Sequence, residues 1–161
     1  MGMIACLTAV DAAARATWHD DPAAVEELLD TSADERTLDL DKAWHGIHFL
    51  LTGAVEGGPE PLASAVLGGV PVGEDLGYGP ARWLAPEQVA EIASALDIYD
   101  RAALYARYDP DAMTRLDVYP GVMWARDRDA AFDYLWEYFT QMVAFYRATA
   151  ERGEALLLWL T

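Results

Sequence analysis

Four polar side chains recur at helical spacing inside an otherwise apolar stretch of the chain. Asp41, His45, His48 and Thr52 follow one another at intervals of four, three and four residues. On a helix this spacing places all four on one face, with neighbouring Cβ atoms roughly 5–6 Å apart. Two neutral imidazoles and a carboxylate could hold a divalent ion, and a water in the open position would then serve hydrolysis. This polar stripe is the main candidate for chemistry in the sequence.

A structural role for the same side chains is the alternative, and we favour it. Histidines three residues apart on a packed helix more often serve the fold than bind metal. His45 would then bind a backbone carbonyl, His48 would pack against Trp44, and Asp41 would cap the helix. On this interpretation we expect no metal ion, no cofactor and no catalytic residue.

The helix that carries the stripe is predicted between Leu38 and Gly53. A carboxylate from Asp39 or Asp41 can cap its first turn, and Gly53 can supply the left-handed residue that ends it. Its apolar residues widen into a broad sector of the helical wheel, so the helix should be covered nearly all round. They are Leu40, Ala43, Trp44, Ile47, Leu50 and Leu51.

A polar stripe on a buried helix needs polar partners, because buried polar groups are nearly always hydrogen-bonded. Other segments of the chain offer three suppliers, namely Tyr78, Arg82 and Tyr119. We therefore predict a shallow binding cleft near the stripe, with Lys42 or Arg82 as its only nearby positive charge. The walls of this cleft would be His45, His48, Tyr78, Tyr119 and Trp124.

Other signatures of catalysis are missing from the sequence. There is no Gly-x-Ser-x-Gly motif, and Cys6 lies in an apolar run where a thiol is usually inert. A single cysteine also excludes an intrachain disulfide and zinc sites built from several cysteines. His19 is the only other histidine, so a third nitrogen ligand could come only from there. Our first hypothesis is a non-enzymatic binding or regulatory module, and the alternative is a small-molecule or metal-dependent hydrolase that uses the stripe.

Charge is the clearest property of the composition. The 161 residues include 27 acids and 11 Lys or Arg, which gives a net charge of −16. Binding to nucleic acid is not expected, because affinity for phosphate comes from clustered basic side chains. The acids could simply keep the surface solvated. They could also match a basic partner protein, such as a nuclease covered by an inhibitor or immunity-type protein.

Neither a secretory signal nor an apolar run long enough to span a bilayer is visible in the sequence. We therefore expect a cytoplasmic protein that does not bind membranes.

Hydrophobic periodicity predicts a single α+β domain over residues 1–161. Apolar runs indicate strands at 3–10, 81–84 and 155–160, and the last should pair with the first in a central position. These strands should belong to a small mixed sheet of about three to five strands, with a helical majority around it. Helices are expected over 12–18 with a cap at Asp11, after Asp21-Pro22, over 62–67 and 86–96, and after caps at Asp100 and Asp109-Pro110. The longest helix should run from Asp129 or an earlier aspartate to about Arg152.

Two connecting segments are recognised by their glycine and proline content. The segment 70–80 is rich in glycine and should be irregular backbone near the surface. Pro120 and Gly121 suit the centre of a type II turn, which would bring Tyr119 and Trp124 close together.

Several stretches of the sequence share the pattern of a known family. The longest runs from Leu38 to Gly53, and shorter ones are Pro61-Leu62, 65–69, Tyr119 to Val122 and the opening Met1 to Ile4. Together these stretches resemble the YfbM-like bacterial family of unknown function, over nearly the whole chain. The resemblance implies a single α+β domain from a bacterium, with no established activity and no catalytic residue to carry over.

Overall fold

The computed structural model describes residues 2–18 and 20–161. Its centre is one five-stranded sheet in which all neighbouring strands are antiparallel. The strands follow the order β2-β1-β5-β4-β3 across the sheet. They are β1 (Ala5–Val10), β2 (Thr37–Asp39), β3 (Val70–Asp75), β4 (Pro80–Leu84) and β5 (Ala155–Leu160).

The central position of β5 confirms what its apolar sequence predicts. It pairs with β1 along its whole length and with β4 on its other side. Its first four residues are buried, as expected for a strand covered on both faces.

The prediction of a mixed sheet is wrong. The helical connections from β1 to β2 and from β4 to β5 return the chain at the same end of the sheet, whereas a parallel pair needs a crossover to the opposite end.

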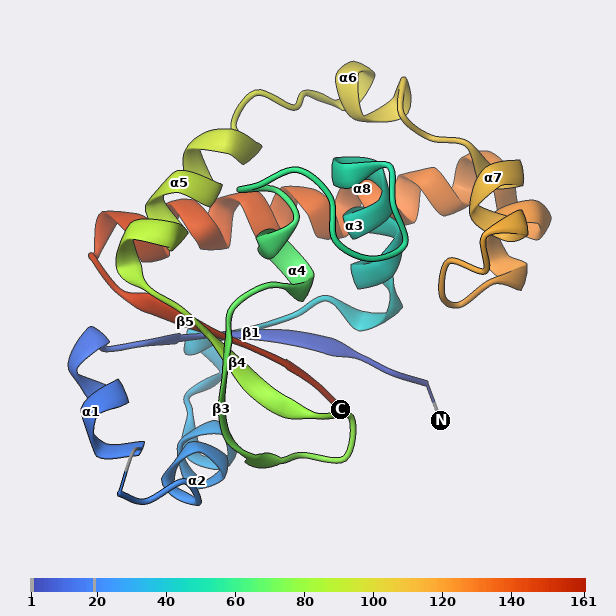
Figure 1. Ribbon diagram of the computed structural model, residues 1–161. Helices are drawn as coiled ribbons and strands as arrows, with labels where there is room; N and C mark the ends of the chain where they lie inside the picture. The colour runs from blue at the N-terminus through green and yellow to red at the C-terminus, as the bar shows by residue number, and fades with distance from the viewer. Residues whose placement is uncertain (1, 19) are drawn as a thin grey trace.

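Helices form most of the remaining structure and lie on both faces of the sheet (Figure 1). The short 3-10 helices are η1 (Ala12–Ala14), η2 (Asp34–Arg36) and η3 (Asp41–Ala43). The α-helices are α1 (Arg15–Trp18), α2 (Ala24–Thr31), α3 (Trp44–Thr52), α4 (Ser64–Leu67), α5 (Pro86–Leu96), α6 (Arg101–Tyr105), α7 (Pro110–Arg115) and α8 (Val122–Glu151). Figure 1 shows α1 and α2 on one side of the sheet and α3, α4, α5 and α8 on the other. Among the described residues, no helix combines the length and apolar character needed to cross a bilayer.

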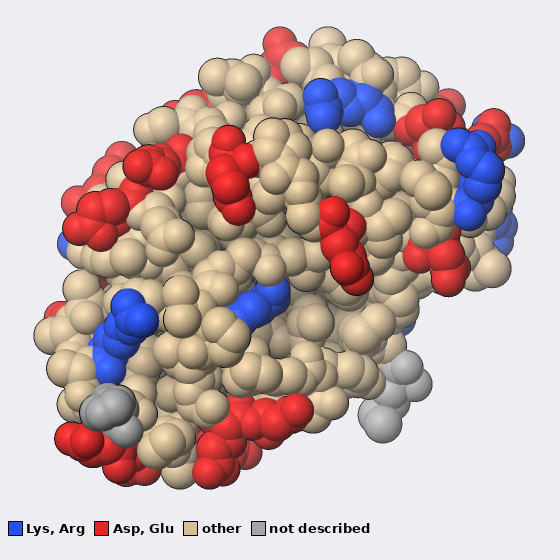
Figure 2. All heavy atoms as spheres, viewed as in Figure 1, with Lys and Arg blue, Asp and Glu red and all other residues tan. Residues whose placement is uncertain are grey.

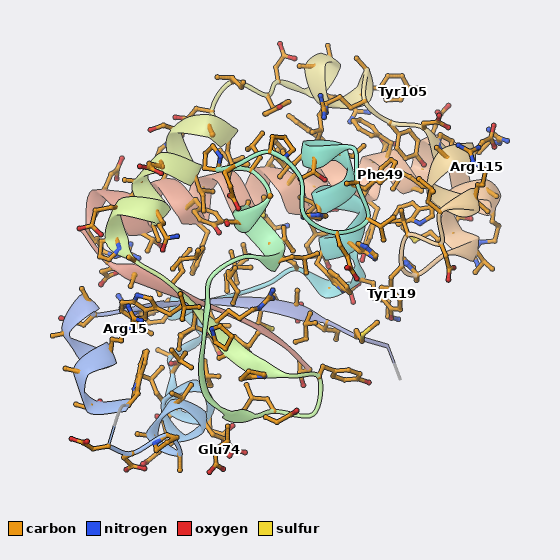
Figure 3. All side chains as sticks on the ribbon, in the orientation of Figure 1. Arg15, Phe49, Glu74, Tyr105, Arg115 and Tyr119 are labelled. Carbon is orange, nitrogen blue, oxygen red and sulfur yellow. The ribbon has the colours of Figure 1, made fainter. Side chains whose placement is uncertain are left out.

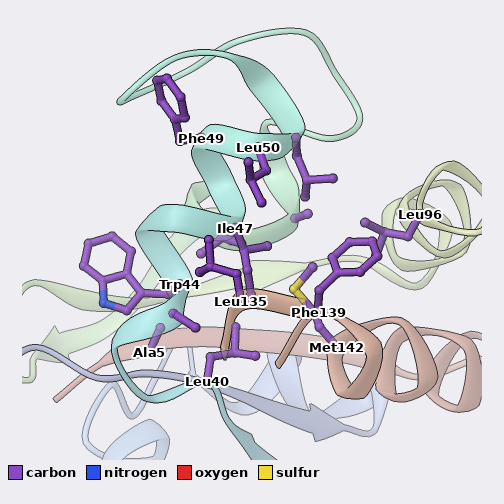
Figure 4. Packing of buried hydrophobic residues seen from close by; sticks show 14 of the residues in the cluster. Ala5, Leu40, Trp44, Ile47, Phe49, Leu50, Leu96, Leu135, Phe139 and Met142 are labelled. Atoms are coloured by element: carbon purple, nitrogen blue, oxygen red, sulfur yellow. The ribbon is translucent and has the colours of Figure 1, made fainter. Parts of the chain in front are cut away.

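The main core lies between the sheet and the larger helical layer. In this core Ile47 of α3 lies beside Leu135 of α8, and Phe139 continues the same face of α8 (Figure 4). A smaller apolar cluster lies between the opposite face of the sheet and the helices α1 and α2. There Trp18 meets Trp83 edge to face, with ring centroids 5.4 Å apart. The sheet is thus buried on both faces, which requires apolar residues on both sides of its central strands.

Two strands were not expected from the sequence. The segment 70–80, predicted to be irregular, forms β3 and a hairpin to β4, with Val70 opposite Trp83. The glycines and Pro71 in this segment argue against a strand when the sequence is considered alone. Proline is nevertheless tolerated on an edge strand, which is the position of β3 in the sheet. β2 spans only three residues and is too short to show periodicity.

The predicted aspartate caps are formed at Asp11, Asp100 and Asp109, while the longest helix begins earlier than expected. The Asp100 and Asp109 carboxylates each accept a hydrogen bond from a backbone N–H of the following first turn. α8 begins at Val122 and contains a non-helical residue, Arg128, with φ 41° and ψ −108°. The predicted start at Asp129 therefore marks the regular part of the helix that follows this kink.

Candidate functional site

The polar stripe lies on α3, which the rest of the fold encloses. Every residue from Trp44 to Leu51 is buried. Gly53 adopts the left-handed conformation, with φ 74°, and ends the helix as predicted. The Arg107 guanidinium donates hydrogen bonds to the carbonyls of Leu50 and Leu51, which satisfies acceptors that the end of a helix leaves open.

Asp41, the first residue of the stripe, is bound by a tyrosine of α8. Its carboxylate accepts a 2.9 Å hydrogen bond from the Tyr134 hydroxyl, and this hydroxyl accepts a bond from the Lys42 N–H. Burial and the Asp41 carboxylate raise the pKa of Tyr134, so this phenol stays protonated. The predicted cap of the helix is wrong, since neither aspartate caps the first turn of α3. The Asp39 carboxylate instead accepts from the Asp41 N–H, 2.6 Å away.

His45 joins two segments that are distant from it in sequence. Its Nε2 atom donates a hydrogen bond to the Val55 carbonyl, and its Nδ1 atom accepts one from the Tyr119 backbone N–H. The donor–acceptor distance is 2.9 Å in each bond. The second bond needs a lone pair on Nδ1, so the ring is neutral with its proton on Nε2. Burial lowers the pKa of His45, while the Val55 carbonyl and the carboxylates of Glu56 and Asp117 act in the opposite direction.

His48 has no exposed surface and no hydrogen-bond partner for either ring nitrogen in the part of the chain that the structure describes. Burial and the neighbouring His45 lower the pKa of His48, whereas the Gly57 backbone and Glu56 favour its protonated form. The Trp44 ring stacks on His45, with centroids 4.8 Å apart, whereas the sequence led us to expect packing of Trp44 against His48.

Thr52, the last residue of the stripe, binds backbone on both sides. Its hydroxyl donates a hydrogen bond to the His48 carbonyl at a distance of 2.8 Å and accepts one from the Ala54 N–H at 3.1 Å. Much of what faces the stripe is therefore backbone of the loop directly after α3. The expected bond from His45 to a backbone carbonyl is confirmed, but the sequence did not identify this loop as the source of the carbonyl.

Two of the predicted cleft residues do lie beside α3. The Tyr119 ring, labelled in Figure 3, stacks on Trp44 with centroids 5.7 Å apart. Trp124 is fully buried, and its indole N–H donates to the Val118 carbonyl over 2.6 Å. The turn between them is closed by the Gly121 N–H and the Val118 carbonyl, which places it one residue earlier than predicted.

The other predicted residues lie elsewhere. Arg82 on β4 donates to two backbone carbonyls of α4, and burial lowers the pKa of its guanidinium. Tyr78 is 51% exposed in the connection between β3 and β4, away from α3 (Figure 1). The predicted cleft is wrong, because His48 and Trp124 are fully buried and Tyr78 lies on another part of the surface.

The described residues contain no group of three or more His, Cys, Asp or Glu side chains placed to hold a metal ion. His45 uses both ring nitrogens for backbone groups, and the Asp41 carboxylate is bound to Tyr134. His19, the suggested source of a third ligand, lies outside the described residues. These contacts give the hydrolase alternative no support.

An acidic surface on the other side of the sheet is the feature that sequence reasoning missed. Figure 2 shows acidic side chains gathered along the edge where α2 and β3 lie. These elements touch, because a Cβ atom at Gly73 of β3 would lie 2.8 Å from Val25 of α2. The acidic surface consists of exposed carboxylates from both elements and their flanks, namely Asp20, Asp21, Glu26, Glu27, Asp30, Asp34, Glu35, Glu74 and Asp75. The acids between 20 and 35 are visible in the sequence, but only the fold adds those of β3.

Comparison with known proteins agrees with this architecture. Protein YfbM of Escherichia coli (strain K12) is 26% identical over 138 residues, which are 83% of this chain and 81% of that protein. The crystal structure of YfbM from Escherichia coli, described as a protein of unknown function, matches with a TM-score of 0.74 and 21% identity. That match covers 98% of this chain and 99% of the other, and it confirms the single α+β fold. A model of the family described as "Domain of unknown function (DUF1877)" matches residues 1–159, and the chain belongs to this family.

Proposed function

We propose that the protein is a non-enzymatic binding module that docks a basic partner protein on the acidic surface. The observation that carries this proposal is the concentration of exposed carboxylates over α2 and β3. The ion pairs between described residues engage acids elsewhere, at Asp97, Asp111, Asp127, Asp133 and Glu154. The acidic surface is therefore free to attract positive charge from outside, which raises association rates and selects basic partners.

Tyr78 supplies an aromatic contact next to this charge. It lies in the connection that follows Glu74 and Asp75, and the Asp75 carboxylate accepts hydrogen bonds from the N–H groups of Gly77 and Gly79. These bonds hold the connection in one shape, so little conformational entropy is lost when a partner binds. Exposed tyrosines are frequent energetic centres of protein interfaces.

The single cysteine and the acidic charge of the chain narrow the class of partner. A bacterial cytoplasm is the compartment that suits a chain with one cysteine, and there a strongly acidic module is suited to cover the cationic site of a basic enzyme, as an inhibitor or immunity-type protein does. The interface would weaken with salt, because exposed charge pairs are screened within about 8–10 Å at physiological ionic strength.

A charge-reversal series tests the proposal. The first variant combines Glu27→Lys, Asp30→Lys and Glu74→Lys, whose side chains make no hydrogen bond or ion pair with other described residues. The matched control combines Glu91→Lys, Glu137→Lys and Glu151→Lys, which changes the net charge equally but lies on α5 and α8. Both are immobilised beside wild type, and basic proteins retained from a lysate of the native bacterium are quantified at low and physiological salt.

The proposal expects a basic protein that wild type and the control retain and that the first variant loses by at least about tenfold, the equivalent of 1.4 kcal/mol. Tyr78→Ala should weaken retention of the same protein. If both charge variants lost the basic protein equally, net charge alone would explain its retention, and the proposed docking surface would be wrong. Retention of no basic protein by wild type would overturn the function itself.

A further inference from the structure

The loop that follows α3 is fastened to the helix through a histidine. The Val55 carbonyl accepts from His45 Nε2, and about two turns later on α3 the Thr52 hydroxyl accepts from the Ala54 N–H. Between them His48 lies beside the Gly57 backbone with no exposed surface. Successive polar side chains of α3 thus face the loop 54–61 along one line.

The turn 118–121 is fastened to α3 by the same imidazole. His45 Nδ1 accepts from the Tyr119 N–H, so a proton on Nδ1 would set two N–H groups against each other. His48 reinforces this dependence, because a charged imidazole with no exposed surface and no good hydrogen bond is costly. The observed packing is therefore compatible only with neutral rings.

Few charges surround the two rings. Glu56 of the loop faces both histidines, and Asp117, which directly precedes the turn, faces His45. The two imidazoles also oppose each other's protonation, as the influence of His45 on His48 shows. On the basic side, Lys42 lies near the Tyr119 hydroxyl, and Arg107 binds the carbonyl end of α3. Burial outweighs the two carboxylates, so the pKa of each histidine is lowered.

We infer that His45 and His48 form a proton-sensitive latch, which holds the loop 54–61 and the turn 118–121 on α3 while both rings are neutral and releases them when protons bind. The loop carries Glu60, which with Pro61, Ser64, Gln88, Glu91 and Ile92 lines a groove of about 410 Å³ against α5. Release of the loop would therefore move one wall of this groove. Acidification would change a surface of the protein without unfolding its sheet.

The direction of the pH effect follows from linkage. A histidine with a lowered pKa binds fewer protons in the closed state than in the open state. The closed state is therefore fully favoured above the ordinary histidine pKa of about 6.5 and loses its advantage as the pH falls below that value.

Amide hydrogen exchange of the whole protein, followed by NMR between pH 7 and pH 5, tests the latch. After correction for intrinsic exchange, the protection of the Tyr119 amide should fall by at least about tenfold in wild type, while the strands β1 and β5 stay protected. The variant His45→Gln/His48→Phe should show less than about twofold change, because glutamine can donate and accept at position 45 without titrating. His19→Gln is the control and should behave as wild type.

A second measurement on wild type keeps the inference testable if the double variant does not fold. The imidazole resonances of His45 and His48 should titrate below the ordinary value, and the Tyr119 amide shift should follow the same midpoint. Ordinary titration of both rings would overturn the latch. So would Tyr119 protection that falls equally in wild type and in a folded double variant.

Discussion

Gly46 of α3 and Trp124 of α8 are in such close contact that position 46 has no room for a side chain. A Cβ atom there would lie 2.7 Å from the Trp124 ring and 2.7 Å from a Leu135 methyl group. Both of these side chains are fully buried and have little freedom to move aside. The approach of α3 to α8 therefore depends on a residue without a side chain at this position.

Replacement of this glycine should destabilise the protein although alanine favours helices. For Gly46→Ala, overpacking costs about 1–3 kcal/mol, and better helix propensity returns about 1 kcal/mol. Because two contacts at 2.7 Å place the overpacking in the upper part of this range, we expect the free energy of unfolding, measured by urea denaturation, to fall by about 1–2 kcal/mol. Gly153→Ala is the control for backbone conformation alone, because Gly153 has φ 65° and open space around it. Unchanged stability of Gly46→Ala would contradict the packing of α3 on α8.

The role of His45 in stability gives a second prediction. His45→Ala leaves the Val55 carbonyl and the Tyr119 N–H without their partner, which should cost about 1–3 kcal/mol in free energy of unfolding at pH 7.5. His45→Gln can restore both hydrogen bonds and should keep more than half of that stability. If His45→Ala removed partner binding at almost no cost in stability, the ring would have a functional role and the structural assignment would be wrong.

The parts of the fold that the sequence predicts are those whose signal is local. β1, β5 and α5 are apolar at regular spacing over six to eleven residues, and their type follows from that periodicity. β2 and β3 are edge strands, and pairing with a neighbour rather than their own composition makes them strands. The kink at Arg128 likewise has no local signal, since arginine is a good helix former.

The candidate site was predictable only as a set of residues. Helical spacing identifies His45 and His48 as neighbours on one face, and the structure places both on α3. Their surroundings are backbone groups such as the Val55 carbonyl and the Tyr119 N–H. Each residue carries such groups regardless of its side chain, so the sequence holds no information on which of them will meet an imidazole.

Glu154 provides a prediction of pH dependence. Its carboxylate accepts a hydrogen bond from Arg36 at 2.8 Å and another from Arg152 at 2.7 Å. The contact with Arg36 connects η2 to the start of β5. Partial burial acts to raise its pKa, but the hydrogen bonds from Arg152 and Arg36 outweigh burial and lower the pKa below its ordinary value of 4.5. The carboxylate therefore contributes stability that is present above that value and is lost as the pH falls through the lowered pKa.

Glu154→Gln should lose about 1 kcal/mol of unfolding free energy at pH 7, as expected for a partly exposed pair of ion contacts. The difference from wild type should disappear as the pH falls from 5 towards 3, which urea denaturation across that range would measure. Asp133→Asn is the control, because its pair with Arg101 is exposed on both sides and should contribute almost nothing. A difference that grows on acidification would contradict the assigned direction of the pKa shift.

Cys6 gives the last prediction, on chemical reactivity. Its side chain lies in β1 with 6% exposure, and burial, with a smaller influence from the Asp39 carboxylate, raises its pKa from 9.0 to about 12. Because the thiolate is the reactive form, a rise of three pKa units lowers its population near pH 8 by about a thousandfold.

Alkylation of the folded protein by iodoacetamide should accordingly be at least about a hundredfold slower than alkylation in urea, with local opening of β1 supplying the residual rate. Mass spectrometry of the reaction at pH 8 measures both rates, and Cys6→Ser shows that the label is on the thiol. Since β1 pairs with β2 and β5, its opening should need disruption of the sheet and should slow further when the protein is stabilised. Equal alkylation rates in the folded and unfolded protein would mean that Cys6 is not buried in β1 between β2 and β5.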